Sequence, residues 1–238
     1  PLYSSAASDV YKRQAYNIGV GFTAGQSITT GIQNTIIGGL AGDALTDADY
    51  NVALGTSALG ADTLGSRNTA LGRSALSSQN FTTATDSYNT AVGFNAGTAV
   101  TTGVQNTIIG GNAGDALTTG NSNVSVGYNS LSTNTAAHRN TAVGENALAT
   151  FNVTTSTNTY NTAVGYSAGV DITTGTSNTI MGGLAGDALT EGSRNLVMGQ
   201  GALTTDTLGS RSVALGYATL TTQNFTTATN SNNTAVGY

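Results

Sequence analysis

The chain has little charge and no long apolar stretch. Of its 238 residues 8% are charged, and the 7 basic residues are scattered singly within a net charge of −5. Because binding a phosphate backbone needs clustered lysine and arginine, nucleic acid is excluded as a partner. The apolar runs are only a few residues long, whereas a membrane-spanning helix needs about 20 residues. We therefore expect no membrane contact within these residues.

Cysteine is absent and histidine occurs once. His138 has no second histidine or cysteine with which to share a metal, and acid–base catalysis needs a positioned partner, so we interpret His138 as a solvated loop residue. The carboxylates are too thinly spread to form a paired site, and no nucleophile, zinc or phosphate-binding motif occurs. The sequence predicts a protein that is not an enzyme and has no cofactor or metal. The lack of an exposed thiol suits an extracellular setting.

Apolar residues amount to 38% and aromatic residues to 6%, which is too little for a broad globular core. A chain rich in glycine, serine, threonine and asparagine can be disordered, but disordered chains usually combine high charge with no fixed apolar spacing. This chain has low charge and a fixed spacing, so we favour an ordered fold with a narrow core.

The spacing comes from a repeat that starts at Asn17. A motif that begins with asparagine and ends with an aliphatic residue and glycine recurs after 17, 17, 17 and 21 residues, which makes a 72-residue block. The blocks are 17–88, 89–160 and 161–232, followed by a partial block at 233–238. Ser212 is the only replacement of the motif asparagine. A short period of this kind indicates a solenoid of stacked turns, about twelve of them here.

Individual columns of the repeat predict which side chains point inward. When the motif asparagine is counted as position 1, position 4 is always aliphatic and position 5 is always glycine. Position 9 is glycine in the first two turns of each block and leucine in the last two. Where position 9 is glycine, position 12 is an aliphatic residue, as Leu45 is in the turn of Gly42. Because a close-packed interior needs a constant volume, we predict that positions 4, 9 and 12 are buried. Each buried aliphatic residue contributes about 1.5 to 3 kcal/mol, so Val143→Asp is expected to open the stack locally.

The same columns favour strands over helices. A helical solenoid would avoid glycine at a fixed interior site, where it costs about 1 kcal/mol relative to alanine. Segments such as NTAVG and NVALG are short β-compatible runs closed by glycine. The sequence predicts an all-β fold, a parallel β-solenoid with two short strands per turn, and rungs about 4.8 Å apart in a rod on the order of 60 Å long. We expect the glycine at position 5 to need a positive φ or to lack room for a Cβ, and the asparagines to pair with the copies above and below.

Residues 1–14 stand apart from the repeat. Ser4 to Gln14 read SSAASDVYKRQ, which resembles a translated sequencing adapter, so we treat 1–14 as foreign to the fold and expect them to be disordered. Residues 15–238 are expected to form a single solenoid domain. The start without methionine and the stop six residues into a turn lead us to expect that both ends are truncated.

Two motif variants carry a family resemblance. Asn51 to Gly55 read NVALG, Ser212 to Gly216 read SVALG, and NTAVG is the commoner form. Residues 15–238 resemble the head repeats of trimeric autotransporter adhesins and the NTAVG arrays of phage tail fibres. The resemblance implies a left-handed parallel β-roll, a homotrimer, and a rod at the cell surface or on a virion that presents or provides a binding surface. The repeats here are longer than those of the adhesins and include an additional loop in every fourth turn.

Two motifs leave a second function open, that of a monomeric solenoid that binds calcium or ice along one face. Asp43, Asp115 and Asp187 end hexads of the form GGxAGD, which are similar to calcium-binding repeats but lie 72 residues apart. The other interpretation is that each carboxylate hydrogen-bonds a corner of the chain. Threonine pairs such as Thr101 and Thr102 occur on some turns only, whereas an ice-binding face needs them on every turn.

The 21-residue turns give the candidate site. Their four additional residues bring aromatic residues to the same corner in every fourth turn, namely Phe81, Tyr88, Phe151, Tyr160 and Phe225. Because loops on one edge of a solenoid often carry binding, we expect these residues to contact a ligand or to pack between chains of a trimer. The favoured function is a non-enzymatic segment of a phage tail fibre or bacterial surface adhesin. It would act as a rigid spacer and bind a host-surface glycan or receptor.

Overall fold

A computed structural model describes residues 16–238, so the adapter-like segment 1–14 lies outside the described residues. Within 16–238 the regular structure is entirely β, and no helix there is long and apolar enough to cross a membrane. The contacts group the chain into two compact units, one ending at Thr119 and the other running from Gly120 to Tyr238. This division does not follow the three blocks of the sequence, and each unit is described by itself.

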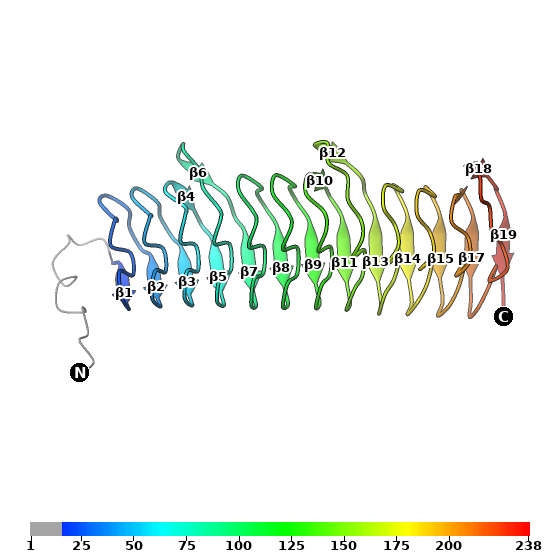
Figure 1. Ribbon diagram of the computed structural model, residues 1–238, viewed down its shortest axis with the longest axis horizontal. Helices are drawn as coiled ribbons and strands as arrows, with labels where there is room; N and C mark the ends of the chain where they lie inside the picture. Colours follow the sequence, from blue (N-terminus) through cyan, green and yellow to red (C-terminus); the bar gives the residue numbers. More distant parts are fainter. Residues whose placement is uncertain (1–15) are drawn as a thin grey trace. The chain divides into compact units, whose positions relative to one another are not determined.

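The first unit stacks six strands in parallel, one per turn (Figure 1). They are β1 (Ile18–Val20), β2 (Thr35–Ile37), β3 (Val52–Leu54), β5 (Thr69–Leu71), β7 (Thr90–Val92) and β8 (Thr107–Ile109). Val20 pairs with Ile37 and Ile37 with Leu54, so equivalent positions of successive turns are in register. A second, two-residue pair, β4 (Gly65–Ser66) with β6 (Thr85–Asp86), forms at the long turn. The predicted parallel β-solenoid is confirmed.

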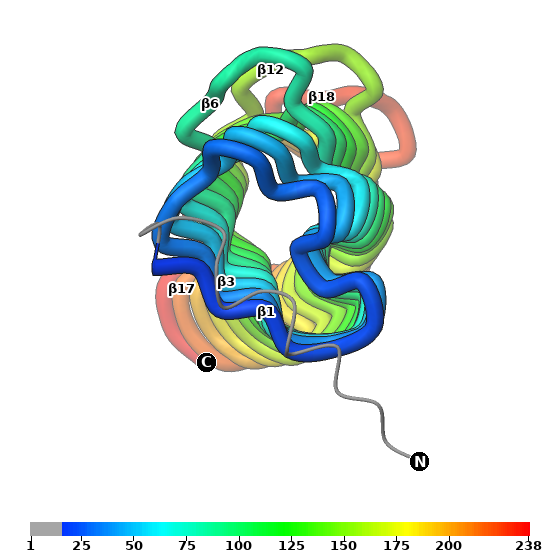
Figure 2. Tube along the Cα trace, turned by 90° about the vertical axis from the view of Figure 1, so that its left-hand side faces the viewer, coloured from blue at the N-terminus to red at the C-terminus, as the bar shows by residue number. Residues whose placement is uncertain are grey.

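The second unit repeats this arrangement with seven strands. They are β9 (Val124–Val126), β11 (Thr141–Val143), β13 (Thr162–Val164), β14 (Thr179–Met181), β15 (Leu196–Met198), β17 (Val213–Leu215) and β19 (Thr234–Val236). Two short pairs accompany its long turns, β10 (Ala137–His138) with β12 (Thr157–Asn158), and β16 (Gly209–Ser210) with β18 (Thr229–Asn230). Within this unit both long turns extend beyond the outline of the shorter ones, at β12 and β18 (Figure 2).

The prediction of a second strand in every turn is wrong outside the long turns and the turn directly before each of them, where the short pairs form. Elsewhere the second segment is bent, and it contributes separate backbone hydrogen bonds such as Thr29 N–H to Thr46 O, at 2.9 Å. A run of bends does not build a regular ladder, so a strand forms only where the longer connection lets two residues extend side by side.

The core consists of positions 3, 8, 9 and 12 of the repeat. Leu59 and Leu76 at position 9 and Leu45 at position 12 have no exposed surface, as predicted. The prediction for position 4 is wrong, since Leu54 is 48% exposed whereas its neighbour Ala53 at position 3 is fully buried. Successive side chains of a strand point to opposite faces, so positions 2 and 4 face outward whenever position 3 faces inward.

Glycine and asparagine hold the turns together in the predicted way. Gly38 at position 5 has a φ of +131°, and a Cβ placed on it would lie 2.6 Å from the carbonyl oxygen of Gly55 in the next turn. The Asn34 side chain is fully buried, and its Nδ2 donates to Asn17 Oδ1 at 3.1 Å and to the carbonyl oxygen of Ala48 at 2.7 Å. The backbone N–H of Asn34 donates to the same Asn17 oxygen, at 2.8 Å. The predicted pairing between asparagines of adjacent turns is therefore confirmed.

Candidate binding surface

The outward face of the strands carries an uncharged aliphatic column along each unit. In the first unit position 4 is occupied by Val20, Ile37, Leu54, Leu71, Val92 and Ile109. In the second unit it is occupied by Val126, Val143, Val164, Met181, Met198, Leu215 and Val236. Each of these side chains is half-exposed or exposed. A contiguous apolar stripe of this kind on a protein surface indicates an interaction surface.

Aromatic side chains border this face on both sides. Position 6, directly after the invariant glycine, holds the exposed rings of Phe94 in the first unit and of Tyr128 and Tyr166 in the second. The position directly before the motif asparagine, which is position 17 in a short turn and position 21 in a long turn, holds the exposed rings of Tyr50 and Tyr88 in the first unit. The face is therefore apolar at its centre and amphipathic at its rim.

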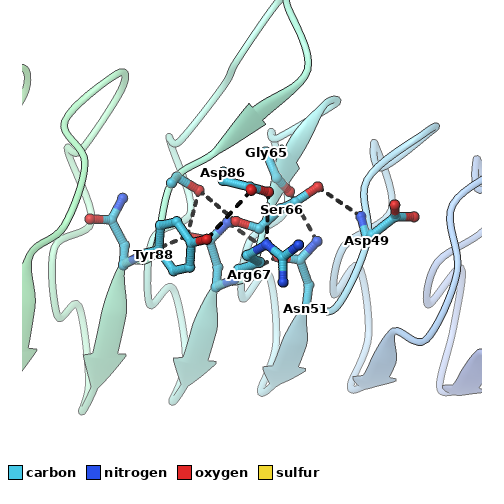
Figure 3. Close-up of polar contacts among 10 residues, drawn as sticks. Asp49, Asn51, Gly65, Ser66, Arg67, Asp86 and Tyr88 are labelled. Carbon is cyan, nitrogen blue, oxygen red and sulfur yellow. Dashed lines mark hydrogen bonds and ion pairs between the residues drawn. The ribbon is translucent and has the colours of Figure 1, made fainter.

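The rim of the first unit contains a stacked cluster, defined by Tyr50, Arg67, Tyr88 and Asp86, which we call the Tyr–Arg cluster. The Arg67 guanidinium carbon lies 4.7 Å from the ring centroid of Tyr50 and 5.8 Å from that of Tyr88. Arg67 Nε lies 2.9 Å from Asp86 Oδ1, and this ion pair joins the rim to the long turn (Figure 3). The hydrogen bond with Asp86 raises the pKa of the Arg67 guanidinium, so Arg67 stays positively charged.

The backbone explains why the cluster forms. Tyr50, Arg67 and Tyr88 have φ values of 59°, 65° and 50°, so each turns its side chain away from the strand that follows. Beneath them Ser66 Oγ accepts the Asp49 N–H at 2.9 Å, and Asn51 Nδ2 donates to the Gly65 carbonyl at 2.9 Å (Figure 3). These bonds fix consecutive turns at the rung spacing, at which planar side chains stack.

The second unit keeps only part of this cluster. Arg139 Nη1 donates to the Tyr160 hydroxyl at 2.9 Å, with the guanidinium carbon 5.7 Å from the ring centroid. Asn158 stands where the first unit has Asp86, and Ser122 stands where it has Tyr50. The fold is the same, so these surface side chains are not requirements of the stack.

The five aromatic residues predicted from the sequence divide into two groups. Tyr88 and Tyr160 are 51% and 50% exposed and belong to the rim. Phe81 and Phe151 are buried and Phe225 is half-buried, which leaves Phe81 and Phe151 no surface to offer a ligand or a second chain. Phe151 occupies position 12, one of the core positions of the repeat, and Phe81 lies at position 14 of its turn with its ring next to Gly65.

Tyr50, Arg67 and Asp86 are surface residues that the sequence reasoning missed. The position directly before the motif asparagine holds Tyr50, Arg67 and Tyr88 in consecutive turns, and this column of large side chains is the signal that could have identified them.

The aspartates of the GGxAGD hexads do not come together with other ligands. Burial raises the pKa of Asp115 and Asp187, and hydrogen bonds from backbone N–H groups at the same corner offset part of the rise. Oδ1 of each is buried without a hydrogen-bond partner. Within residues 16–238 no group of three or more histidine or acidic side chains could hold a metal ion. The geometry favours a structural role at the corner.

Comparison of the chain with protein-family models, curated proteins and solved structures found no match.

Proposed function

We propose that the chain is a non-enzymatic segment of an extracellular fibre, of the kind found in phage tail fibres and bacterial surface adhesins. Its role is that of a rigid spacer that also presents a surface to a host glycan or receptor. The observation that carries the proposal is the uncharged aliphatic column on the outward face of each unit, described above. Rigidity has a separate basis, since consecutive turns share backbone pairing and buried asparagine bonds such as that of Asn34 with Asn17.

The aliphatic column favours assembly with further copies of the chain. A second solenoid has the same rung spacing, so side chains such as Ile37 and Leu54 can pack against their equivalents at every rung. Packing three copies around one axis covers the column of every chain in a closed arrangement. We therefore propose a homotrimer.

The rim supports the binding role. Tyr50 and Tyr88 offer flat exposed rings, and Arg67 and Asp86 offer charged hydrogen-bonding groups beside them. Rings with adjacent donors and acceptors suit a sugar, which has an apolar face and a hydroxyl edge. A host-surface glycan fits this surface better than a nucleic acid does, because the chain carries a net charge of −5.

Light-scattering measurement of the molar mass tests the assembly. We expect three chains per particle, and single chains for the variant with Ile37→Lys and Leu54→Lys, which places two charges in the aliphatic column. The matched control carries Gln26→Lys and Ser78→Lys, at exposed positions outside the strand face, and should remain trimeric. A wild-type chain that is monomeric, while its circular dichroism spectrum shows that the β structure is folded, would refute the proposal.

The alternative is a monomeric solenoid that binds calcium. It has one observation in its favour, the buried and unpartnered Oδ1 of Asp115 and Asp187. Thermal unfolding with calcium and with a chelator separates the two functions. A stabilisation by calcium that disappears in the Asp187→Asn variant would favour the alternative.

A further inference from the structure

One side chain in the second unit links three successive turns through an ionisable ring. His138 lies at position 16 of its turn, in β10. Its Nδ1 accepts a hydrogen bond from the backbone N–H of Asn121, in the preceding turn, at 2.8 Å. Its Nε2 lies 2.7 Å from Ser156 Oγ, in the following long turn. The sequence predicted that His138 is a solvated loop residue. In the structure its ring instead connects the preceding turn to the following long turn.

The two contacts require the neutral ring. A nitrogen that accepts a hydrogen bond has a free lone pair, so the proton of the neutral imidazole lies on Nε2, which donates to Ser156. Protonation of Nδ1 would place two N–H groups opposite each other at the Asn121 contact. The ring can then keep its position only by losing the bond to Asn121.

The other two blocks provide an internal comparison. Ser66 and Ser210 occupy the place of His138, and their Oγ atoms accept the equivalent backbone N–H groups at 2.9 and 3.0 Å. A hydroxyl makes this bond at any physiological pH. The place of Ser156 is taken by Ala84 and Ala228, which cannot bond to a side chain at position 16. Histidine and its serine partner therefore occur together, and only in the second block.

The surroundings disfavour the charged ring. Burial is the main cause that lowers the pKa of His138, and the positive charge of Arg139 beside it adds to the effect. The groups that contact the ring from the preceding turn and from the long turn, Asn121 and Ser156, are uncharged. Tyr160, the nearest titratable group of the long turn, is bonded to Arg139.

We propose that His138 is a pH-dependent latch, which through its contacts with Asn121 and Ser156 holds the long turn 152–160 against the preceding turn at neutral pH, and which releases this turn in mildly acidic solution, where the protonated ring loses the Asn121 contact. The sign follows from the neutral ring of the folded state. The stability that His138 contributes is fully present above about pH 6.5, the ordinary pKa of histidine, and is lost as the pH falls through the lower value of the folded chain. Tyr160 lies at the end of this turn, so the latch controls how the rim of the second unit is presented. The proposal does not depend on which ligand the fibre binds.

Hydrogen exchange at pH 7.5 and pH 5.0, corrected for the intrinsic pH dependence of exchange, tests the latch. Losing one hydrogen bond corresponds to about a five- to tenfold change in an opening equilibrium. We expect a loss of protection of that size at acidic pH for the Asn121 amide and for residues 152–160. The long turns 80–88 and 224–232 of the same chain are internal controls and should not change.

A double variant separates the latch from general acid sensitivity. His138→Ser with Ser156→Ala installs the pair that the first block has at Ser66 and Ala84, so it retains the fold. In this variant the exchange of residues 152–160 should be independent of pH. Acid-induced exchange that is equal in all three long turns, or that persists in the double variant, would overturn the proposal.

Discussion

Neighbouring glycines at the end of β2 allow a direct test of how the turns stack. Gly38 has a φ of +131°, a region that other residues rarely adopt, and a Cβ on it would lie 2.6 Å from the carbonyl oxygen and 2.7 Å from the carbonyl carbon of Gly55. A Cβ on Gly39 would meet no atom within 4 Å. The two positions are adjacent in sequence and differ in two respects, since only Gly38 has a positive φ and only Gly38 is closely approached by the next turn.

The structure gives the size of the expected difference. Backbone strain at a φ of this kind costs of order 1–3 kcal/mol, and pushing the next turn away adds about 1–3 kcal/mol, as overpacking does in other cores. We expect Gly38→Ala to lower the free energy of unfolding by about 3 to 5 kcal/mol. Gly39→Ala should change it by less than about 1 kcal/mol, because it only reduces the freedom of the unfolded chain.

Urea unfolding followed by far-ultraviolet circular dichroism measures both variants. Hydrogen exchange then shows whether the loss in Gly38→Ala is concentrated at β2 and β3, where the clash lies. Equal effects of the two substitutions, or a larger effect at Gly39, would refute the argument that the closeness of successive turns excludes a Cβ at position 5.

Much of the fold follows from the sequence because the repeat samples each position many times. The parallel stack, the glycine at position 5 and the asparagine pairing were all predictable. The direction of position 4 was not, because positions 3 and 4 are both apolar in segments such as NTAVG and three-residue strands show no clear alternation. One signal for the inward direction of position 3 was missed. In the turn that starts at Asn34, the large Ile36 at position 3 occurs together with the small Gly42 at position 9. A Cβ on Gly42 would lie 3.1 Å from Ile36 Cδ1, so these two positions share one volume.

The candidate surface was harder to predict. Arg67 and Tyr88 are 21 residues apart, and their stacking depends on the left-handed backbone directly before the motif asparagine, which no residue type there demands. Phe151 was assigned to the surface with Phe81 because both lie near the additional loop. Phe151 stands at position 12, a column predicted to be buried, so the column pattern contradicted this assignment, whereas Phe81 stands at position 14, for which the columns predicted no burial.

Three further substitutions test the core assignments. Asn51→Ala removes the acceptor of the Asn68 N–H and the donor to the Gly65 carbonyl, each bonded at 2.9 Å, so urea unfolding should show a loss of about 2–4 kcal/mol; a loss below about 1 kcal/mol would contradict the role of the asparagine bonds. Ala142→Asp buries a charge and should abolish folding or cost at least about 3 kcal/mol by the same measurement. Val143→Asp, one residue later on the outward face, should cost the isolated chain less than about 1 kcal/mol, and equal losses at the two positions would contradict the corrected orientation of the strand.

The core also contains a buried polar unit in the first block. Asp62 and Gln79 are fully buried at position 12 of adjacent turns, and Gln79 Nε2 donates to Asp62 Oδ2 at 2.6 Å. The other carboxylate oxygen accepts the backbone N–H groups of Gly65 and Phe81, each at 3.1 Å. A Cβ on Gly65 would collide with this carboxylate, so the aspartate requires the glycine. The third block repeats the unit with Asp206, Gln223 and Gly209.

In the second block all three members of this unit differ together. Asn134 replaces the aspartate and accepts the backbone N–H of Ala137 at 3.1 Å, while Phe151 fills the place of the glutamine and is fully buried. Ala137 is tolerated where the other blocks need glycine. Because a half-satisfied buried polar network costs more than an apolar core, replacing one member alone would be unfavourable. The concerted change therefore argues that the Asp–Gln–Gly unit and the Asn–Phe–Ala unit are alternative ways of packing one section of the core.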